Sequence, residues 1–229
     1  MKIDWGPEEW LIMAIRVLLA DDHAIVRHGL SRSIQQQEDM EVVGQASDGH
    51  AAVEKARELA PDVIVMDISM PGLNGIDATR TILRASPDTR VVGLSMHSAK
   101  RYVREMFRAG ASGYLLKDCE FDELIQTIRL VAQGQTYISP SIGRVVTENY
   151  VHDGLENNDN AFSVLTPRER EILQLISEGN NTKQIAARLF ISPKTVEAHR
   201  LRMTKKLDIH NIALLTKYAI QEGLTSPEP

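Results

Sequence analysis

The 229-residue chain has 43% hydrophobic and 25% charged residues, an ordinary soluble composition that excludes wholesale disorder and a fibrous protein. The net charge is −5, but residues 165–229 carry ten Lys or Arg against seven Asp or Glu, so that this part is +3 and residues 1–164 are −8. The single cysteine, Cys119, excludes an internal disulfide framework and fits a reducing compartment. Length and charge together favour two domains with different partners.

The N-terminus carries one short apolar run, from Trp10 to Ile15, which Arg16 interrupts. This run is far below the roughly 20 residues that a membrane-spanning helix needs. We therefore predict a cytoplasmic protein with no membrane partner. Residues 1–12 precede Met13 and resemble nothing that follows, so we treat them as an extension or an upstream-start artefact without a function.

From Ile15 onward, short β-rich runs alternate with amphipathic stretches of helical length. Two of the runs, IRVLLA and VIVMD, are almost continuously apolar, as strands buried on both faces must be. Five βα units in succession predict an α/β domain, a (βα)5 flavodoxin-like fold with a parallel sheet covered on both faces. The strands are expected at 15–20, 41–46, 62–66, 90–95 and 113–116, and the helices at 24–36, 49–59, 75–85, 100–109 and 120–133.

The alternation ends after residue 133. Residues 134–164 contain a short amphipathic stretch near 140–150 and the Asn/Asp/Gly-rich run HDGLENNDNAFS, so we assign them to a linker. Beyond it only helices are predicted, at 167–178, 182–190, 193–206 and 211–222. We therefore expect an all-α four-helix domain over 165–225, after a first domain over 13–133.

Polar side chains gather where the predicted strands end. Asp21 and Asp22 follow the first strand, Asp67 the third, Ser95 the fourth and Lys117 the fifth. Because ligand sites of open α/β sheets lie at the carboxyl ends of the strands, we expect these five groups to converge. One such residue alone would be a turn or surface residue, but the joint placement predicts a site.

Three neighbouring carboxylates repel one another unless a cation neutralises them. Hard oxygen ligands with open positions suit Mg²⁺, which keeps several of its waters. Asp67 then has a use beyond ligation, because its carboxylate can attack a phosphoryl donor and form an acyl phosphate. Lys117 would balance the added charge, and Ser95 would donate a hydrogen bond to the phosphoryl group.

These residues, with the runs DISMPGLNGIDA and GYLLKD, resemble the receiver domain of two-component response regulators over about residues 13–133. The resemblance implies that Asp67 is the phosphoacceptor. It implies Mg²⁺ ligation by the side chains of Asp22 and Asp67 and the backbone carbonyl of Ser69, with Asp21 in the outer shell. A sensor histidine kinase is the implied partner.

The same resemblance gives roles to aromatic and neighbouring positions. Tyr114, three residues before Lys117, matches the aromatic switch position and is expected to turn inward on phosphorylation. Ser69 and His97, two residues beyond Asp67 and Ser95, match positions that bias the lifetime of the acyl phosphate.

The C-terminal segment predicts a capped helix, a turn, a short helix, a second turn and a basic helix. Thr166, Pro167 and Glu169 make a capping box, and Ser192 with Pro193 starts the basic helix in the same way. That helix carries five basic residues against one acidic residue, with Val196, Met203 and Leu207 expected to face inward. A solvated face of a small bundle would also explain the charge, but the helix-turn-helix spacing favours DNA binding.

The motifs LTPRERE, KQIAARLFIS and KTVEAHR resemble the DNA-binding domain of the LuxR/FixJ/NarL type, whose third helix enters the major groove of double-stranded DNA. The resemblance implies one set of residues that mainly hold phosphates and a second that face base edges. The first set is Lys194, Thr195, His199, Arg202 and Lys205, and the second is Glu197, Ala198 and Leu201.

The last helix has an apolar stripe at Ile212, Leu215 and Ala219, which either closes the bundle or pairs two subunits. Family members use this helix for dimerisation on DNA, so a homodimer is expected, and RNA polymerase is a further candidate partner.

These observations predict a phosphorylation-gated transcription regulator, not an enzyme. Phosphorylation of Asp67 would release the recognition helix, promote a dimer, or both. One alternative is a constitutive DNA-binding regulator whose receiver only supports dimers. A second is a phosphatase that forms an aspartyl phosphate, but Ser69 stands where such an enzyme needs a second Asp as acid/base.

Overall fold

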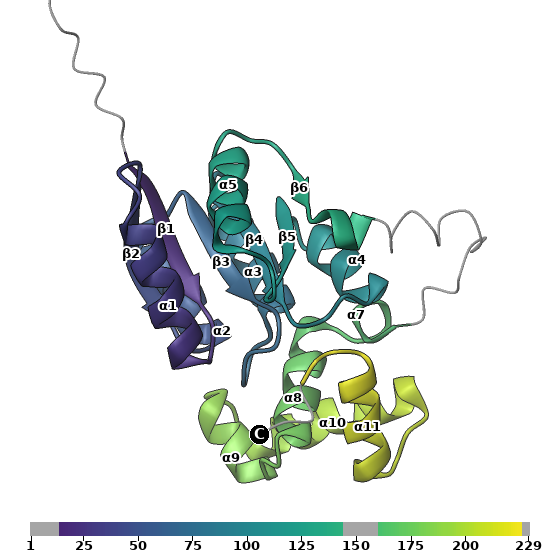
Figure 1. Cartoon of the computed structure of the whole chain (residues 1–229). Helices are drawn as coiled ribbons and strands as arrows, with labels where there is room; N and C mark the ends of the chain where they lie inside the picture. The colour runs from purple at the N-terminus through teal and green to yellow at the C-terminus, as the bar shows by residue number, and fades with distance from the viewer. Residues whose placement is uncertain (1–13, 144–159, 226–229) are drawn as a thin grey trace, which may run out of the picture.

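A computed structural model describes residues 14–143 and 160–225. The first range forms a parallel sheet covered by helices, and the second forms a helical domain that lies beside the carboxyl-end loops of the sheet (Figure 1). The predicted extension at residues 1–12 lies outside the described residues. No helix in the described ranges combines the length and the apolar composition needed to cross a membrane.

The sheet has six parallel strands in the order β2-β1-β3-β4-β5-β6. All five residues of β3 are buried, and so are the last four of β1, which confirms that these apolar runs are central strands. The strands are β1 (Ile15–Ala20), β2 (Met40–Ala46), β3 (Val63–Asp67), β4 (Arg90–Ser95), β5 (Gly113–Leu116) and β6 (Tyr137–Ile138).

Five helices cover the two faces of the sheet. The apolar side chains of α1 and α5 pack on one face, and those of α2, α3 and α4 pack on the other. These helices are α1 (Ala24–Gln35), α2 (Gly49–Leu59), α3 (Gly75–Ala85), α4 (Lys100–Arg108) and α5 (Phe121–Ala132). The predicted α/β class and its doubly covered parallel sheet are confirmed.

Strand β6 was not predicted, because its two residues fall in the stretch that the sequence assigns to the linker. Tyr137 pairs with Gly113 and Ile138 with Tyr114, so β6 extends the sheet beyond β5. A strand of two half-buried residues at the sheet edge is too short to show a period of two. The helix expected near 140–150 is helical at residues 140–143, and its remainder lies outside the described residues.

The second domain contains α7 (Ala161–Val164), α8 (Pro167–Ser177), α9 (Thr182–Arg188), α10 (Pro193–Leu207) and α11 (Ile212–Gln221). The short α7 was not predicted. The capping box of Thr166 and Glu169 begins α8 as expected, and the Ser192 hydroxyl accepts from the Thr195 amide at the start of α10.

Helix α9 ends two residues earlier than predicted. Leu189 has left the helical conformation, and Phe190 adopts a left-handed backbone with φ of 52° while its side chain is 95% exposed. The turn between α9 and α10 therefore begins inside the motif KQIAARLFIS.

Candidate functional site

The parallel strands bring the predicted acidic residues to one edge of the sheet. Asp21 directly follows β1 and Asp67 ends β3, and both carboxylates are almost fully buried. The carboxylate oxygens of Asp21, Asp22 and Asp67 and a ring nitrogen of His23 all lie within 4.8 Å of one another. The carboxylates that were expected to converge therefore do converge.

Lys117 reaches the same place from the residue after β5. Its Nζ lies 2.8 Å from Asp67 Oδ2 and 2.8 Å from Asp21 Oδ2. Burial would lower the pKa of Lys117, but the neighbouring Asp67 and Asp21 carboxylates outweigh burial and hold the pKa above its usual range. Lys117 is therefore a charged group between two carboxylates.

Burial and the neighbouring charge of Lys117 shift the pKa of the Asp67 carboxyl in opposite directions. Burial raises its pKa to about 6, which the positive charge of Lys117 opposes and the negative charge of Asp21 reinforces. The Ser69 amide also donates to Asp67 Oδ1 at 3.2 Å. Burial therefore opposes the negative charge of Asp67, and a further cation beside the carboxylate would favour that charge.

The donor set fits a divalent cation. Asp21 Oδ2 and Asp22 Oδ1 are buried and accept no hydrogen bond of good geometry within the described ranges, although Lys117 and His23 lie within ion-pair distance of them. Oxygen atoms that are buried and under-satisfied suit a hard cation such as Mg²⁺. The Ser69 carbonyl as a ligand stays a prediction.

His23 is a neighbour that sequence reasoning missed. Its Nδ1 lies 2.7 Å from Asp22 Oδ1 and 3.4 Å from Asp21 Oδ1, and its amide donates to Asp21 Oδ1. Its position directly after Asp22 was the only available signal, and adjacency in sequence does not show where a side chain turns.

Ser95 and Tyr114 are held by His97, two residues after β4. The His97 amide donates to the Ser95 hydroxyl oxygen at 3.0 Å, and the Tyr114 hydroxyl donates to the His97 carbonyl at 2.7 Å. Tyr114 is fully buried, and its predicted role as a switch on phosphorylation stays a prediction. The ring of His97 stacks on Tyr102 of α4 at 4.6 Å between centroids.

The outward face of α10 presents most of the predicted DNA-contacting residues. Val196 and Met203 are buried as predicted, Leu207 is half-buried, and Leu201 is 71% exposed. Thr195 and His199 are half-buried, whereas the other predicted contacts are exposed, namely Lys194, Glu197, Ala198, Leu201, Arg202 and Lys205.

Glu197 and Lys206 of α10 make hydrogen bonds to neighbouring helices of the domain. Glu197, predicted to face base edges, accepts from the Thr182 hydroxyl at 2.6 Å. Lys206 donates to Glu169 at 2.6 Å. Glu169 is also part of the capping box of α8, so these contacts connect α10 to α8 and α9.

The sequence left open whether the apolar stripe of α11 closes the bundle or pairs two subunits. Leu215 and Ala219 are fully buried in the domain core and close the bundle. Ile212 and Leu214 are 50% and 55% exposed. Because these two residues are two positions apart on the helix, they do not share one face, and the pairing of two subunits through α11 stays a prediction.

The two domains contact each other through buried polar groups that the sequence did not indicate. The Arg170 guanidinium of α8 makes a two-pronged ion pair with the Asp77 carboxylate of α3, with Nε 2.8 Å from Oδ2. Arg170 is 2% and Asp77 3% exposed. Such a pair demands a defined geometry, because either charge alone would be costly to bury.

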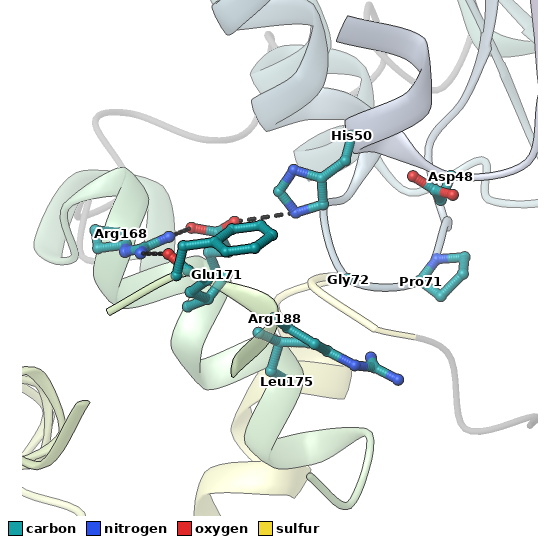
Figure 2. A pocket seen from close by; sticks show the side chains of 10 residues that line it. Asp48, His50, Pro71, Gly72, Arg168, Glu171, Leu175 and Arg188 are labelled. Atoms are coloured by element: carbon teal, nitrogen blue, oxygen red, sulfur yellow. Dashed lines mark hydrogen bonds and ion pairs between the residues drawn. The ribbon is translucent and has the colours of Figure 1, made fainter. Parts of the chain in front are cut away.

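A cavity of about 570 Å³ lies beside this contact (Figure 2). His50 Nε2 lies 3.1 Å from Glu171 Oε1 across the domain boundary, and Arg168 holds the other oxygen of Glu171 at 2.6 Å. The hydrogen bond to Glu171 outweighs burial and raises the pKa of His50. The cavity includes none of the strand-end carboxylates.

Comparison with known families matches both domains. Residues 17–129 match the response regulator receiver domain, and residues 163–219 match the bacterial regulatory proteins of the luxR family. The chain is 40% identical over 215 residues to the oxygen regulatory protein NreC of Staphylococcus carnosus, which covers 92% of this chain and 99% of that protein.

Solved structures give the same result. A two-component response regulator of the LuxR family from Aurantimonas is 37% identical, with a TM-score of 0.59 over 61% of this chain and 99% of that chain. The two-component response regulator RcsB in a DNA complex is 27% identical, with a TM-score of 0.56 over 90% of this chain and 97% of that chain. The chain belongs to the two-component response regulators that join a receiver domain to a LuxR-type DNA-binding domain.

Proposed function

We propose that a sensor histidine kinase phosphorylates Asp67, and that this modification controls dimerisation and binding to double-stranded DNA. The observation that carries the proposal is the position of Lys117 Nζ, 2.8 Å from both Asp67 and Asp21, beside carboxylate oxygens that are buried and under-satisfied. A buried cation between carboxylates can turn to a phosphoryl oxygen as charge develops there. Buried carboxylate oxygens that lack a hydrogen bond of good geometry are more typical of a ligand site than of a contact that only stabilises the fold.

In the proposed reaction an Asp67 carboxylate oxygen attacks phosphorus, and the bond between phosphorus and the donor nitrogen or oxygen breaks. Bound Mg²⁺, held by Asp22, Asp67 and the Ser69 carbonyl with Asp21 behind, would neutralise charge on the transferred group. Lys117 pairs with a phosphoryl oxygen of the product, and Ser95 donates its hydroxyl hydrogen to another. Because Ser69 stands where a phosphatase of this type would need an acid/base Asp, we expect a regulator and not an enzyme.

Dimerisation is the form of control that the exposed surfaces favour. The outward face of α10 is open while the two domains are docked, so phosphorylation need not uncover it. One domain with about five phosphate contacts binds weakly at cellular salt, whereas two linked domains read paired half-sites. Ile212 of the predicted α11 stripe is 50% exposed and could contact a second DNA-bound subunit.

The same open face supports the second candidate, a regulator that binds DNA without phosphorylation. Leu201 is 71% exposed in the docked chain, which a constitutive DNA binder would also show. In either case we place the protein in the cytoplasm with access to DNA, and RNA polymerase is a candidate partner at the promoter.

One experiment separates the two candidates. Purified protein and Asp67→Asn are each incubated with fragmented genomic DNA and Mg²⁺, with and without acetyl phosphate, and bound fragments are sequenced. We expect a few sites with two-fold related sequences, enriched further by the phosphodonor only when Asp67 is present. Equal enrichment in all four samples would establish the constitutive binder.

A further inference from the structure

Helix α8 of the DNA-binding domain holds the loop that follows Asp67. Gln174 Nε2 donates to the Met70 carbonyl at 2.8 Å, and Gln174 Oε1 accepts from the Asn74 amide at 3.0 Å. Glu178 Oε1 accepts from the Gly72 amide at 2.9 Å. The loop that joins Asp67 to α3 is therefore held by these three hydrogen bonds from the DNA-binding domain.

Three of the residues that contact the receiver form one stripe, since Arg170 and Gln174 of α8 and Glu178 directly after it are four residues apart and face the same side of the helix. Gln174 and Asn74 are fully buried, so water cannot replace a broken hydrogen bond without an opening of the interface. The contact is thus part of the packed structure between the domains.

The loop is also packed tightly against Asp67 itself. A Cβ on Gly75 would lie 1.9 Å from the Asp67 carbonyl oxygen, and the Gly75 amide donates to the Ile68 carbonyl at 2.9 Å. The start of α3 and the end of β3 therefore share one backbone arrangement. A shift of Met70 or Asn74 would displace Ser69, which lies between Asp67 and Met70.

We infer that Gln174 is a positioning residue for the chemistry at Asp67, so that the docked DNA-binding domain tightens Mg²⁺ binding and speeds phosphoryl transfer. This inference rests on the proposed function. A loop already held in one conformation does not have to be ordered when a cation or phosphodonor arrives, which favours both steps. Because coupling between two equilibria is reciprocal, Mg²⁺ must also strengthen the docking of α8.

A second contact joins the two domains on the other side of Asp67. The Tyr114 hydroxyl is bound to the His97 carbonyl, the His97 ring stacks on Tyr102, and Tyr102 packs against Gly223 at the end of α11. Gly223 has φ of 75°, and a Cβ there would lie 1.8 Å from the Tyr102 ring. Docking therefore coincides with the inward position of Tyr114, the arrangement expected of the phosphorylated receiver.

The first test compares the phosphorylation rate of the full chain and of Gln174→Leu in acetyl phosphate, over a series of Mg²⁺ concentrations. Gln174→Leu keeps a side chain of similar volume but removes every hydrogen bond from Gln174 to Met70 and Asn74. We expect the rate at limiting Mg²⁺ to fall about five-fold, with the half-saturating Mg²⁺ concentration raised by a similar factor. Ser177→Ala is the matched control, because the Ser177 hydroxyl donates to Leu173 within α8 and does not reach the receiver.

The second readout is hydrogen exchange, which needs no phosphoryl transfer. Mg²⁺ should slow exchange of the Gly72 and Asn74 amides in the wild-type chain and have a smaller effect in Gln174→Leu. If Gln174→Leu fails to fold, Glu178→Ala removes the contact to Gly72 and a hydrogen bond from Gln174 Nε2 to Glu178 Oε1, but leaves the contacts of Gln174 to Met70 and Asn74, and should give the same changes at smaller size.

The inference fails if a folded Gln174→Leu chain, with faster exchange at Asn74, binds Mg²⁺ and takes the phosphoryl group as the wild type does. It fails equally if that variant is phosphorylated faster, since docking would then restrain the site. These outcomes leave Asp67 as phosphoacceptor intact. Phosphorylation that persists in Asp67→Asn would instead overturn the proposed function.

Discussion

The acidic edge of the receiver and the basic face of α10 differ in the burial of their charged groups. At the acidic edge, the buried carboxylates of Asp21 and Asp67 each lie 2.8 Å from the ammonium group of Lys117. On α10, residues such as Lys194, Arg202 and Lys205 are exposed and keep their charge available to a partner in water. The charge interactions of buried groups are set by their nearest neighbours. Exposed groups attract a partner over a longer range, and salt weakens this attraction. Substitutions in the two regions should therefore differ in size and in salt dependence.

The largest effect is expected at Asp67. Asp67→Asn removes the attacking oxygen anion, so incubation with acetyl phosphate and Mg²⁺ should give no protein that carries an added phosphoryl group. Intact-mass spectrometry measures this directly. Asp118→Asn is the control, because Asp118 is next to Lys117 in sequence but is not part of the carboxylate cluster. Comparable mass gain in wild type and Asp67→Asn would place the phosphoacceptor elsewhere.

A large effect on docking is expected from Arg170→Met. The substitution leaves Asp77 buried with only Arg80, 2.8 Å away, as a cationic partner. Breaking a buried ion pair typically costs about 3–5 kcal/mol, and we expect the lower end because Arg80 remains. Small-angle scattering should show a larger radius of gyration, and denaturant unfolding should separate into two transitions.

Arg168→Met is the comparison for that experiment, since Arg168 pairs with Glu171 at a partly exposed position. Its effect should be under about 1 kcal/mol. Similar decreases in stability for Arg170→Met and Arg168→Met would mean that burial does not distinguish these two ion pairs.

Moderate, salt-dependent effects are expected on α10. Arg202→Ala or Lys205→Ala should weaken binding to all DNA sequences alike and reduce the slope of log affinity against log salt by about one unit for each phosphate that the variant no longer neutralises. Lys206→Ala should change the slope less, because Lys206 is paired with Glu169. Fluorescence anisotropy over a salt series measures the slopes, and equal slopes for Lys205→Ala and Lys206→Ala would contradict the assignment.

The smallest effect is expected at the partly exposed His50. Glu171 raises the His50 pKa in the docked chain, an effect that nearby Asp48 supports and Arg168 opposes. The contact between His50 and Glu171 should therefore stabilise docking fully below pH 6.5, the ordinary pKa of histidine. This stabilisation should be lost as the pH rises through the raised pKa of His50. We expect about 0.5 kcal/mol, seen as faster Asn74 amide exchange at about pH 8 than at about pH 6 after correction for intrinsic exchange. His50→Ala should remove that difference.

The sequence indicated the acidic edge well because parallel strands force their ends together. Once Asp21, Asp67 and Lys117 were placed at strand ends, their proximity followed from topology. The turn of His23 toward the carboxylates did not follow, because it depends on a rotamer. The DNA-facing helix was also predictable, since Val196 and Met203 fix which side is buried.

The contact between the domains was beyond sequence reasoning. Arg170 lies within the motif LTPRERE, where its charge is one of several on the same helix, and its partner Asp77 is 93 residues away. No periodicity connects two such positions, because neither the linker nor the choice of helix face is encoded in local pattern. The two-residue strand β6 was missed for the simpler reason that it is too short to alternate.

Arg170, Gln174 and Glu178 form a stripe about 12 Å long, since an α-helix rises about 1.5 Å per residue. Along this line they contact α3 and the loop that follows Asp67. A movement of that loop on phosphorylation would therefore act directly on α8, and the DNA-binding domain would sense the state of Asp67 through one helix.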